Sequence, residues 1–70
     1  MPFKSAELIK KLEKLGFVQK RQAGSHLIMY KTGYQPIIIP VHKGKDVSSG
    51  VERQILKILD MSLAELKNIK

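Results

Sequence analysis

The sequence contains no cysteine and no tryptophan, and only 6% of its residues are aromatic. The absence of thiols excludes a disulfide framework, a zinc ribbon and a cysteine nucleophile. Its two histidines, His26 and His42, stand too far apart in the chain for the short spacing that is typical of a metal site. No glycine-rich phosphate loop opens a helix, which excludes that route to nucleotide hydrolysis. We therefore expect neither a bound metal nor a cofactor.

Long apolar runs are also missing. The longest, such as Ile37–Ile39 and Leu27–Tyr30, fall far short of the roughly 20 residues that a membrane-spanning helix needs. The amino terminus reaches Lys4 and Glu7 without the apolar segment of a signal peptide. We therefore predict a cytoplasmic protein with no membrane partner, and 70 residues predict one domain, residues 1–70.

Acidic residues are scarce, with 6 Asp and Glu against 13 Lys and Arg. Residues 1–45 carry nine basic and two acidic side chains, which already equals the net charge of +7 of the whole chain. Such a field attracts polyanions, and nucleic acid is the commonest of them. A charge of this size also serves solubility alone, so the two interpretations stay open.

Periodicity predicts an α+β domain in the order α-β-β-β-α-α. An apolar residue recurs every three or four positions in the first and last parts of the chain, which indicates helices. The middle part alternates between turn residues and short segments with apolar residues, which indicates a three-stranded antiparallel sheet with the helices on one face. The third strand contains Pro36 and Pro40 and is expected at an edge of the sheet. The predicted elements are a helix over 5–15, strands over 17–22, 26–31 and 36–41, a helix over 49–59 and a short terminal helix with Leu63 and Leu66.

Helix ends are predicted from capping residues. Ser5 is expected to cap the first helix and Gly16 to end it. Two Ser-x-x-Glu sequences match the capping box and predict the starts of the later helices. These sequences are Ser49–Glu52 and Ser62–Glu65.

Lys10, Lys11 and Lys14 fall on the side of the first helix opposite its apolar stripe. This basic ridge predicts a contact with RNA through Lys10 and Lys14. A solvated helix face is the equally weighted alternative.

The segment Gly24-Ser25-His26, which follows Lys20 and Arg21, holds the residue types needed for RNA cleavage without a metal. Histidine exchanges a proton near neutral pH, so His26 could take the proton of a ribose 2′-hydroxyl that then attacks the adjacent phosphorus. Lys20 and Arg21 could hold the phosphodiester, and Gly24 and Ser25 could offer it N–H or hydroxyl groups. On residue types alone, a half-exposed strand histidine with no chemical role is the favoured interpretation.

The same residues carry a resemblance to a known family. Its pattern here is Gly16-Phe17, Arg21–His26, Tyr30, Pro40-Val41-His42, and Gly50 before a helix with Arg53 and Ile55. In this pattern, from about Ser5 to Leu66, the chain resembles the HicA toxins, also called YcfA-like proteins. Where many members have Gly-Thr-Leu-Arg, this chain has Gly50-Val51-Glu52-Arg53.

The resemblance implies a fold like the double-stranded-RNA-binding domain and the activity of an mRNA interferase, a toxin that cleaves mRNA. It implies that His26 is the catalytic residue, that Gly24 and Ser25 form the turn presenting it, and that a HicB antitoxin is the partner. His42 matches the Pro-x-His of the family and is interpreted as a histidine that holds a turn. Two other functions stay open: a non-catalytic double-stranded-RNA-binding module, and a protein-interaction domain whose basic face docks an acidic partner.

Overall fold

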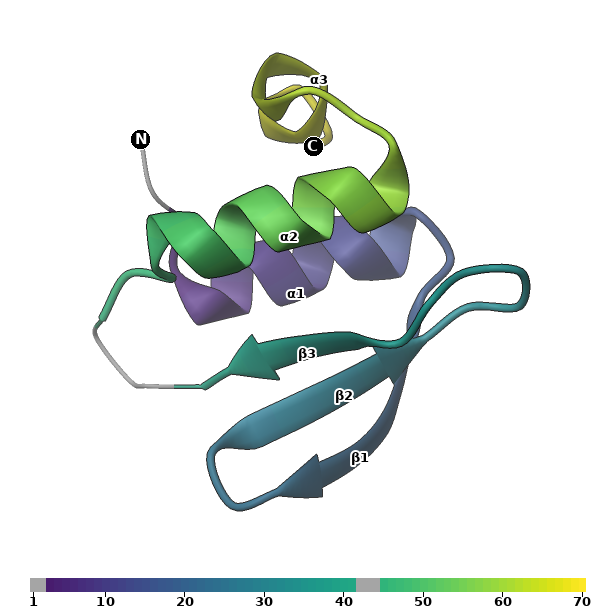
Figure 1. Cartoon of the computed structure of the whole chain (residues 1–70), viewed down its shortest axis with the longest axis vertical. Coiled ribbons are helices and arrows are strands. Elements are labelled where there is room, and N and C mark those ends of the chain that lie inside the picture. The colour runs from purple at the N-terminus through teal and green to yellow at the C-terminus, as the bar shows by residue number, and fades with distance from the viewer. Residues whose placement is uncertain (1–2, 42–44) are drawn as a thin grey trace.

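The computed structural model describes residues 3–41 and 45–70. Its elements follow one another in the predicted order (Figure 1). They are α1 (Ser5–Lys14), β1 (Val18–Ala23), β2 (His26–Tyr30), β3 (Ile37–Pro40), α2 (Ser49–Leu59) and α3 (Leu63–Lys67). The predicted fold class is therefore confirmed. His42, for which we predicted a turn-holding role, lies outside the described residues.

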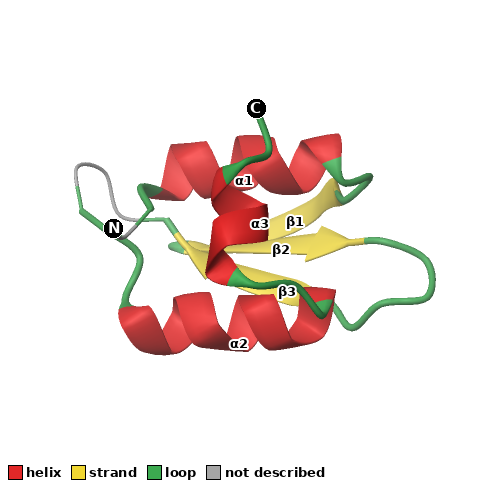
Figure 2. Cartoon of the chain, turned by 90° about the horizontal axis from the view of Figure 1, so that it is seen from above, coloured by secondary structure: helices red, strands yellow, loops and turns green. Residues whose placement is uncertain are grey.

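The three strands form an antiparallel sheet in the order β1-β2-β3, and helices cover one of its faces. Helices α1 and α2 run side by side over the sheet, and α3 lies across them on the side away from the strands (Figures 1 and 2). Alternate strand residues face this helical layer and are buried in one core cluster with Leu8, Leu12 and Leu66. The strand residues of the cluster are Leu27, Met29, Ile37 and Ile39.

Helix α1 ends as predicted but does not begin as predicted. Gly16 has a φ of +100°, and the N–H groups of Gly16 and Phe17 donate to Glu13 O and Leu12 O. This is a Schellman end, and it takes Phe17 out of the predicted first strand. Ser5 is not the cap: it is the first helical residue and is buried, and its Oγ donates to Pro40 O at 2.9 Å.

The start of α2 is shifted by one residue from the prediction. Ser48 is the N-cap and accepts a hydrogen bond from Val51 N at 3.3 Å, so the predicted capping box of Ser49 and Glu52 is wrong. Val47, just before the cap, is buried in the core cluster. Ser48 and Ser49 are both suitable N-cap residues. The burial of Val47 in the core is consistent with the choice of Ser48, the residue that follows it. The predicted capping box of Ser62 and Glu65 is confirmed at α3.

Both edges of the sheet are poor templates for another strand. The Val41 N–H points toward β2, since it donates to Ser25 O at 2.6 Å. In an antiparallel pair the backbone groups of successive residues point alternately toward and away from the partner strand, so those of residues 36, 38 and 40 point away from β2. Pro36 and Pro40 have no N–H to offer there, and Ser5 occupies the Pro40 carbonyl. At the other edge, β1 is interrupted by a bulge between Gln19 and Arg21. A partner of the sheet is therefore expected at its open face rather than at its edges.

Candidate functional site on the open face of the sheet

The face of the sheet that the helices leave uncovered carries both apolar and basic side chains. Cross-strand partners share a face, so the pairs Val18–Tyr30 and Ile28–Ile38 lie on this open face. Val18 and Ile38 are 57% and 53% exposed, and Tyr30 is 41% exposed. Apolar side chains exposed together on one face mark an interaction surface.

His26 is the first residue of β2 and lies on this open face. It is exposed, and its cross-strand partners are Ala23 on β1 and Pro40 on β3. Neither neighbour has a side chain long enough or polar enough to engage the imidazole. The ring that the sequence singles out is therefore accessible to a ligand that approaches the open face.

A tight hairpin turn places His26 at the end of the sheet. The loop has two residues, Gly24 and Ser25, because Ala23, predicted in the loop, pairs with His26. Gly24 has a φ of +59° and its carbonyl accepts from Gln22 Nε2 at 3.1 Å. Within the described residues, the N–H groups of Gly24 and Ser25 and the Ser25 hydroxyl make no hydrogen bond. The sequence predicts that these groups bind a phosphate, and the hairpin places them next to His26 in the chain.

The β-bulge brings Lys20 and Arg21 to the same side of the sheet. Arg21 pairs with Ile28, so it is the diagonal neighbour of His26, within reach of a long side chain. Lys20 follows Val18 by two positions and shares the open face with it, and its Nζ lies 5.8 Å from the ring centroid of Tyr30. In a regular strand the next residue, Arg21, would point to the helices. Both cations therefore lie on the same face of the sheet as His26, and bulges commonly redirect side chains in this way.

The open face has no negative charge of its own, because β1, β2 and β3 contain no Asp or Glu. Glu13 is on α1, where it accepts from Gln19 Nε2 at 3.3 Å, and Asp46 is paired with Lys4 at 2.8 Å. The charged residues within the three strands, Lys20 and Arg21, are both basic, and their charge favours a phosphate group.

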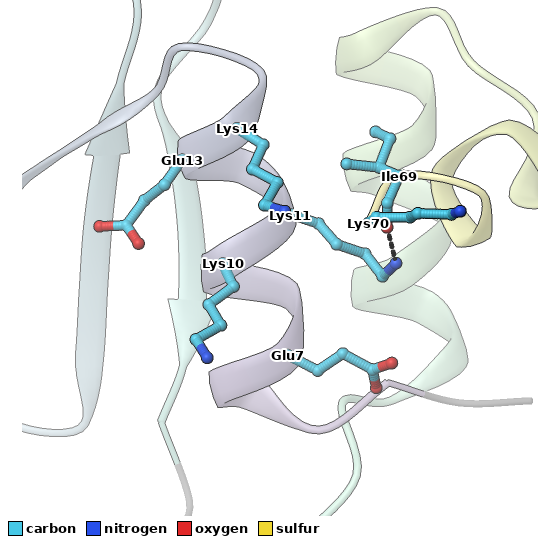
Figure 3. A pocket seen from close by; sticks show the side chains of 7 residues that line it. All are labelled: Glu7, Lys10, Lys11, Glu13, Lys14, Ile69 and Lys70. Atoms are coloured by element: carbon cyan, nitrogen blue, oxygen red, sulfur yellow. Dashed lines mark hydrogen bonds between the residues drawn. The ribbon is translucent and has the colours of Figure 1, made fainter.

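Lys10 and Lys14 are not part of this arrangement. They lie on α1, which covers the opposite face of the sheet, and they line a groove between α1 and the C-terminal residues Ile69 and Lys70 (Figure 3). The third lysine of the predicted ridge, Lys11, has a structural role: its Nζ donates to Lys67 O at 3.1 Å and also to Ile69 O. Any contact of Lys10 or Lys14 with RNA would therefore be separate from the surface around His26.

Sequence analysis did not place Tyr30 in the site. Tyr30 carries part of the family resemblance, and its place in β2, four residues after His26, puts its ring on the same face as the imidazole. An alternating strand that starts at His26 would have given this signal, because residues 26, 28 and 30 must share a face.

Gly24→Ala is expected to lower the free energy of unfolding by about 1–2 kcal/mol, because a φ of +59° strains a residue that has a Cβ. Crowding is not the cause, since nothing lies within 4 Å of the added Cβ. Gly50→Ala is the matched control: its surroundings are equally open, but Gly50 is helical, so stability should rise by up to about 1 kcal/mol. Urea denaturation measures both, and two shifts of the same sign would contradict this account of the turn.

Fold and site together define a small α+β domain with a basic, partly apolar sheet face around one exposed histidine. The family model described as "HicA toxin of bacterial toxin-antitoxin" matches residues 5–61, which include all of this face. The chain therefore belongs to the HicA toxin family, as the resemblance predicted. It is a toxin of a toxin–antitoxin pair, and its partner is an antitoxin.

No curated protein sequence matches the chain. In the described parts of the chain, no helix has the length and apolar character needed to cross a membrane. Across residues 3–41 and 45–70, no three His, Cys, Asp or Glu side chains gather as a metal site would require.

Proposed function

We propose that this toxin is an endoribonuclease that cleaves mRNA with His26 as general base and acid and without a metal. The observation that carries the proposal is the position of His26: it is exposed on the open face, diagonal to Arg21, and next to a hairpin turn whose N–H groups make no hydrogen bond within the described residues. Proton transfer, phosphate binding and charge stabilisation are the three tasks of such a reaction, and each has a residue here.

The proposed reaction assigns one step to each of these groups. His26 takes the proton of a ribose 2′-hydroxyl, and the 2′-oxygen forms a bond to the adjacent phosphorus. Arg21 and the N–H groups of Gly24 and Ser25 stabilise the additional negative charge on the phosphate oxygens. The bond from phosphorus to the 5′-oxygen breaks, and the imidazolium of His26 returns its proton to that oxygen. The products are a 2′,3′-cyclic phosphate and a 5′-hydroxyl, and DNA is excluded because it has no 2′-hydroxyl.

We propose that the antitoxin is HicB-like and neutralises the toxin by covering the open face. Val18 and Ile38 are exposed beside Lys20 and Arg21, so a partner that offers apolar and acidic groups would match this surface. The proline-blocked edge of β3 favours contact through side chains over addition of a strand. We propose that the toxin and its antitoxin form this complex in the cytoplasm.

A non-catalytic double-stranded-RNA-binding module is less well supported. Modules of that kind read the shape of the duplex through phosphate and 2′-hydroxyl contacts. In this chain the first turn of α2 holds Glu52 and no lysine, and the cations near His26 lie on the uncovered sheet face instead.

Digestion of a long single-stranded transcript in the presence of EDTA tests the proposal. We expect fragments with 2′,3′-cyclic phosphate ends, and no cleavage of DNA of the same sequence. Loss of cleavage on addition of EDTA would contradict the metal-independent mechanism. Tight binding to an RNA duplex without any cleavage would favour the non-catalytic module.

A further inference from the structure

The chain has two tyrosines with the same exposure but different surroundings. Tyr30 and Tyr34 are both 41% exposed, and a lysine ammonium lies over each ring, at 5.8 Å for Lys20 and 5.1 Å for Lys31. Tyr34 packs edge-to-face against the buried Phe17, with ring centroids 5.5 Å apart. It belongs to the packing between the β2–β3 loop and the helical layer, whereas Tyr30 stands on the open face.

The two lysines differ in the same way. Lys31 Nζ donates to Leu15 O at 2.6 Å, so its ammonium group binds a carbonyl at the C-terminal end of α1. Lys20 makes no hydrogen bond or ion pair within the described residues, and its contact there is with the ring of Tyr30. The pair of Lys20 and Tyr30 thus combines a cation that has no carboxylate partner with an aromatic ring on an uncovered surface.

We infer that Tyr30 and Lys20 form a binding subsite for a single-stranded stretch of the RNA, with one base stacked on the ring and its phosphate on the ammonium. This inference rests on the proposed ribonuclease function, since it places the RNA across the open face from His26. Proteins that bind single strands use this combination of an aromatic ring and a basic group. Strand pairing places the two together, because Val18 pairs with Tyr30 and Lys20, two residues further along β1, lies on the same face as Val18.

The subsite contacts a nucleotide that flanks the cleaved bond. His26 and Tyr30 are the two ends of β2, four residues apart, which corresponds to about 14 Å along a strand. Arg21 lies between them on the neighbouring strand, opposite Ile28. An RNA strand that follows β2 would pass from the ring, over the guanidinium, to the imidazole.

The base must be unstacked to use this subsite. Within a duplex both faces of a base are covered by its neighbours, so the ring of Tyr30 can receive a base only from a single strand or a loop. The proposal therefore names single-stranded RNA as the substrate class. Because the contact is with the flat face of the base, adenine, with its larger ring system, should bind more tightly than uracil.

Fluorescence anisotropy with labelled oligoadenylate tests the subsite. Every 2′-hydroxyl of the probe is methylated, so the RNA binds but cannot be cleaved. Tyr30→Leu should weaken binding by about five- to a hundred-fold, as loss of one stacked base does elsewhere. Tyr30→Phe keeps the ring and should bind like the parent protein. Tyr34→Leu is the matched control and should leave affinity unchanged, and circular dichroism shows that each variant is folded.

Equal losses in Tyr30→Leu and Tyr34→Leu, or no loss in Tyr30→Leu, would overturn the subsite. Failure of the parent protein to bind the single-stranded probe would do the same. This test can fail independently of the proposed function. If Tyr30→Leu weakens probe binding but His26→Ala still cleaves RNA, only the catalytic mechanism is contradicted. Loss of cleavage in His26→Ala with normal probe binding in Tyr30→Leu would remove the subsite only.

Discussion

Replacing His26 with alanine is expected to slow RNA cleavage by about 10²–10⁴-fold, the usual contribution of general acid–base catalysis. In the proposed reaction the imidazole is the proton acceptor, and the three strands of the open face contain no carboxylate that could replace it. The measurement is the initial rate of cleavage of a single-stranded transcript by purified protein, and growth arrest on expression should disappear in parallel.

Stability separates a chemical role for His26 from a structural one. Because His26 is exposed and its cross-strand neighbours are Ala23 and Pro40, His26→Ala should change the free energy of unfolding by less than about 1 kcal/mol. His42→Ala removes the other histidine and should leave the cleavage rate close to that of the parent protein. Cleavage that persists in His26→Ala, or that disappears only in His42→Ala, would assign the chemistry elsewhere.

Arg21→Gln is expected to reduce kcat by about 10²-fold, as loss of a group that stabilises transition-state charge does in other enzymes. Arg21 is the diagonal neighbour of His26 on the open face, so its guanidinium can reach a phosphate whose ribose contacts the imidazole. The charge of that phosphate grows only as the 2′-oxygen attacks. The loss should therefore fall on kcat more than on KM, and steady-state kinetics on a short RNA separates the two.

Lys14→Gln is the control for total charge. It removes the same unit of positive charge from α1, on the helical side of the sheet, and should leave kcat unchanged (Figure 3). Equal losses in Arg21→Gln and Lys14→Gln at low salt, both vanishing at high salt, would mean that long-range attraction alone is at work. In that case Arg21 would have no specific position at the phosphate.

The main features of the fold were predictable because they depend on neighbours in the sequence. The Schellman end of α1 needs only a glycine after an apolar helix, and the capping box of Ser62 and Glu65 closes within four residues. The two errors at helix starts have a different cause. Ser5 has a partner 35 positions away at Pro40, and the start of α2 follows a residue, Val47, that is anchored in the core.

The candidate site divides in the same way. Gly24, Ser25 and His26 could be named from the sequence because they are consecutive residues that carry part of the family resemblance. The grouping of Lys20 and Arg21 on one face could not, since consecutive strand residues share a face only at a bulge, and the position of this bulge is set by pairing with β2. The structural role of Lys11 was not predictable for the same reason, because the carbonyls to which its Nζ donates belong to the C-terminal segment.

By itself the sequence determined the order of the elements, the excess of positive charge and the histidine at the hairpin, because helix periodicity, turn chemistry and composition are local properties. Only the tertiary structure decided which cations share a face with that histidine. Strand pairing and the β1 bulge direct Lys20 and Arg21 to the open face, while the packing of α1 over the sheet keeps Lys10 and Lys14 on the other side. The physical reason is that a side chain's face depends on the register between strands, and register is a property of contacts between distant segments.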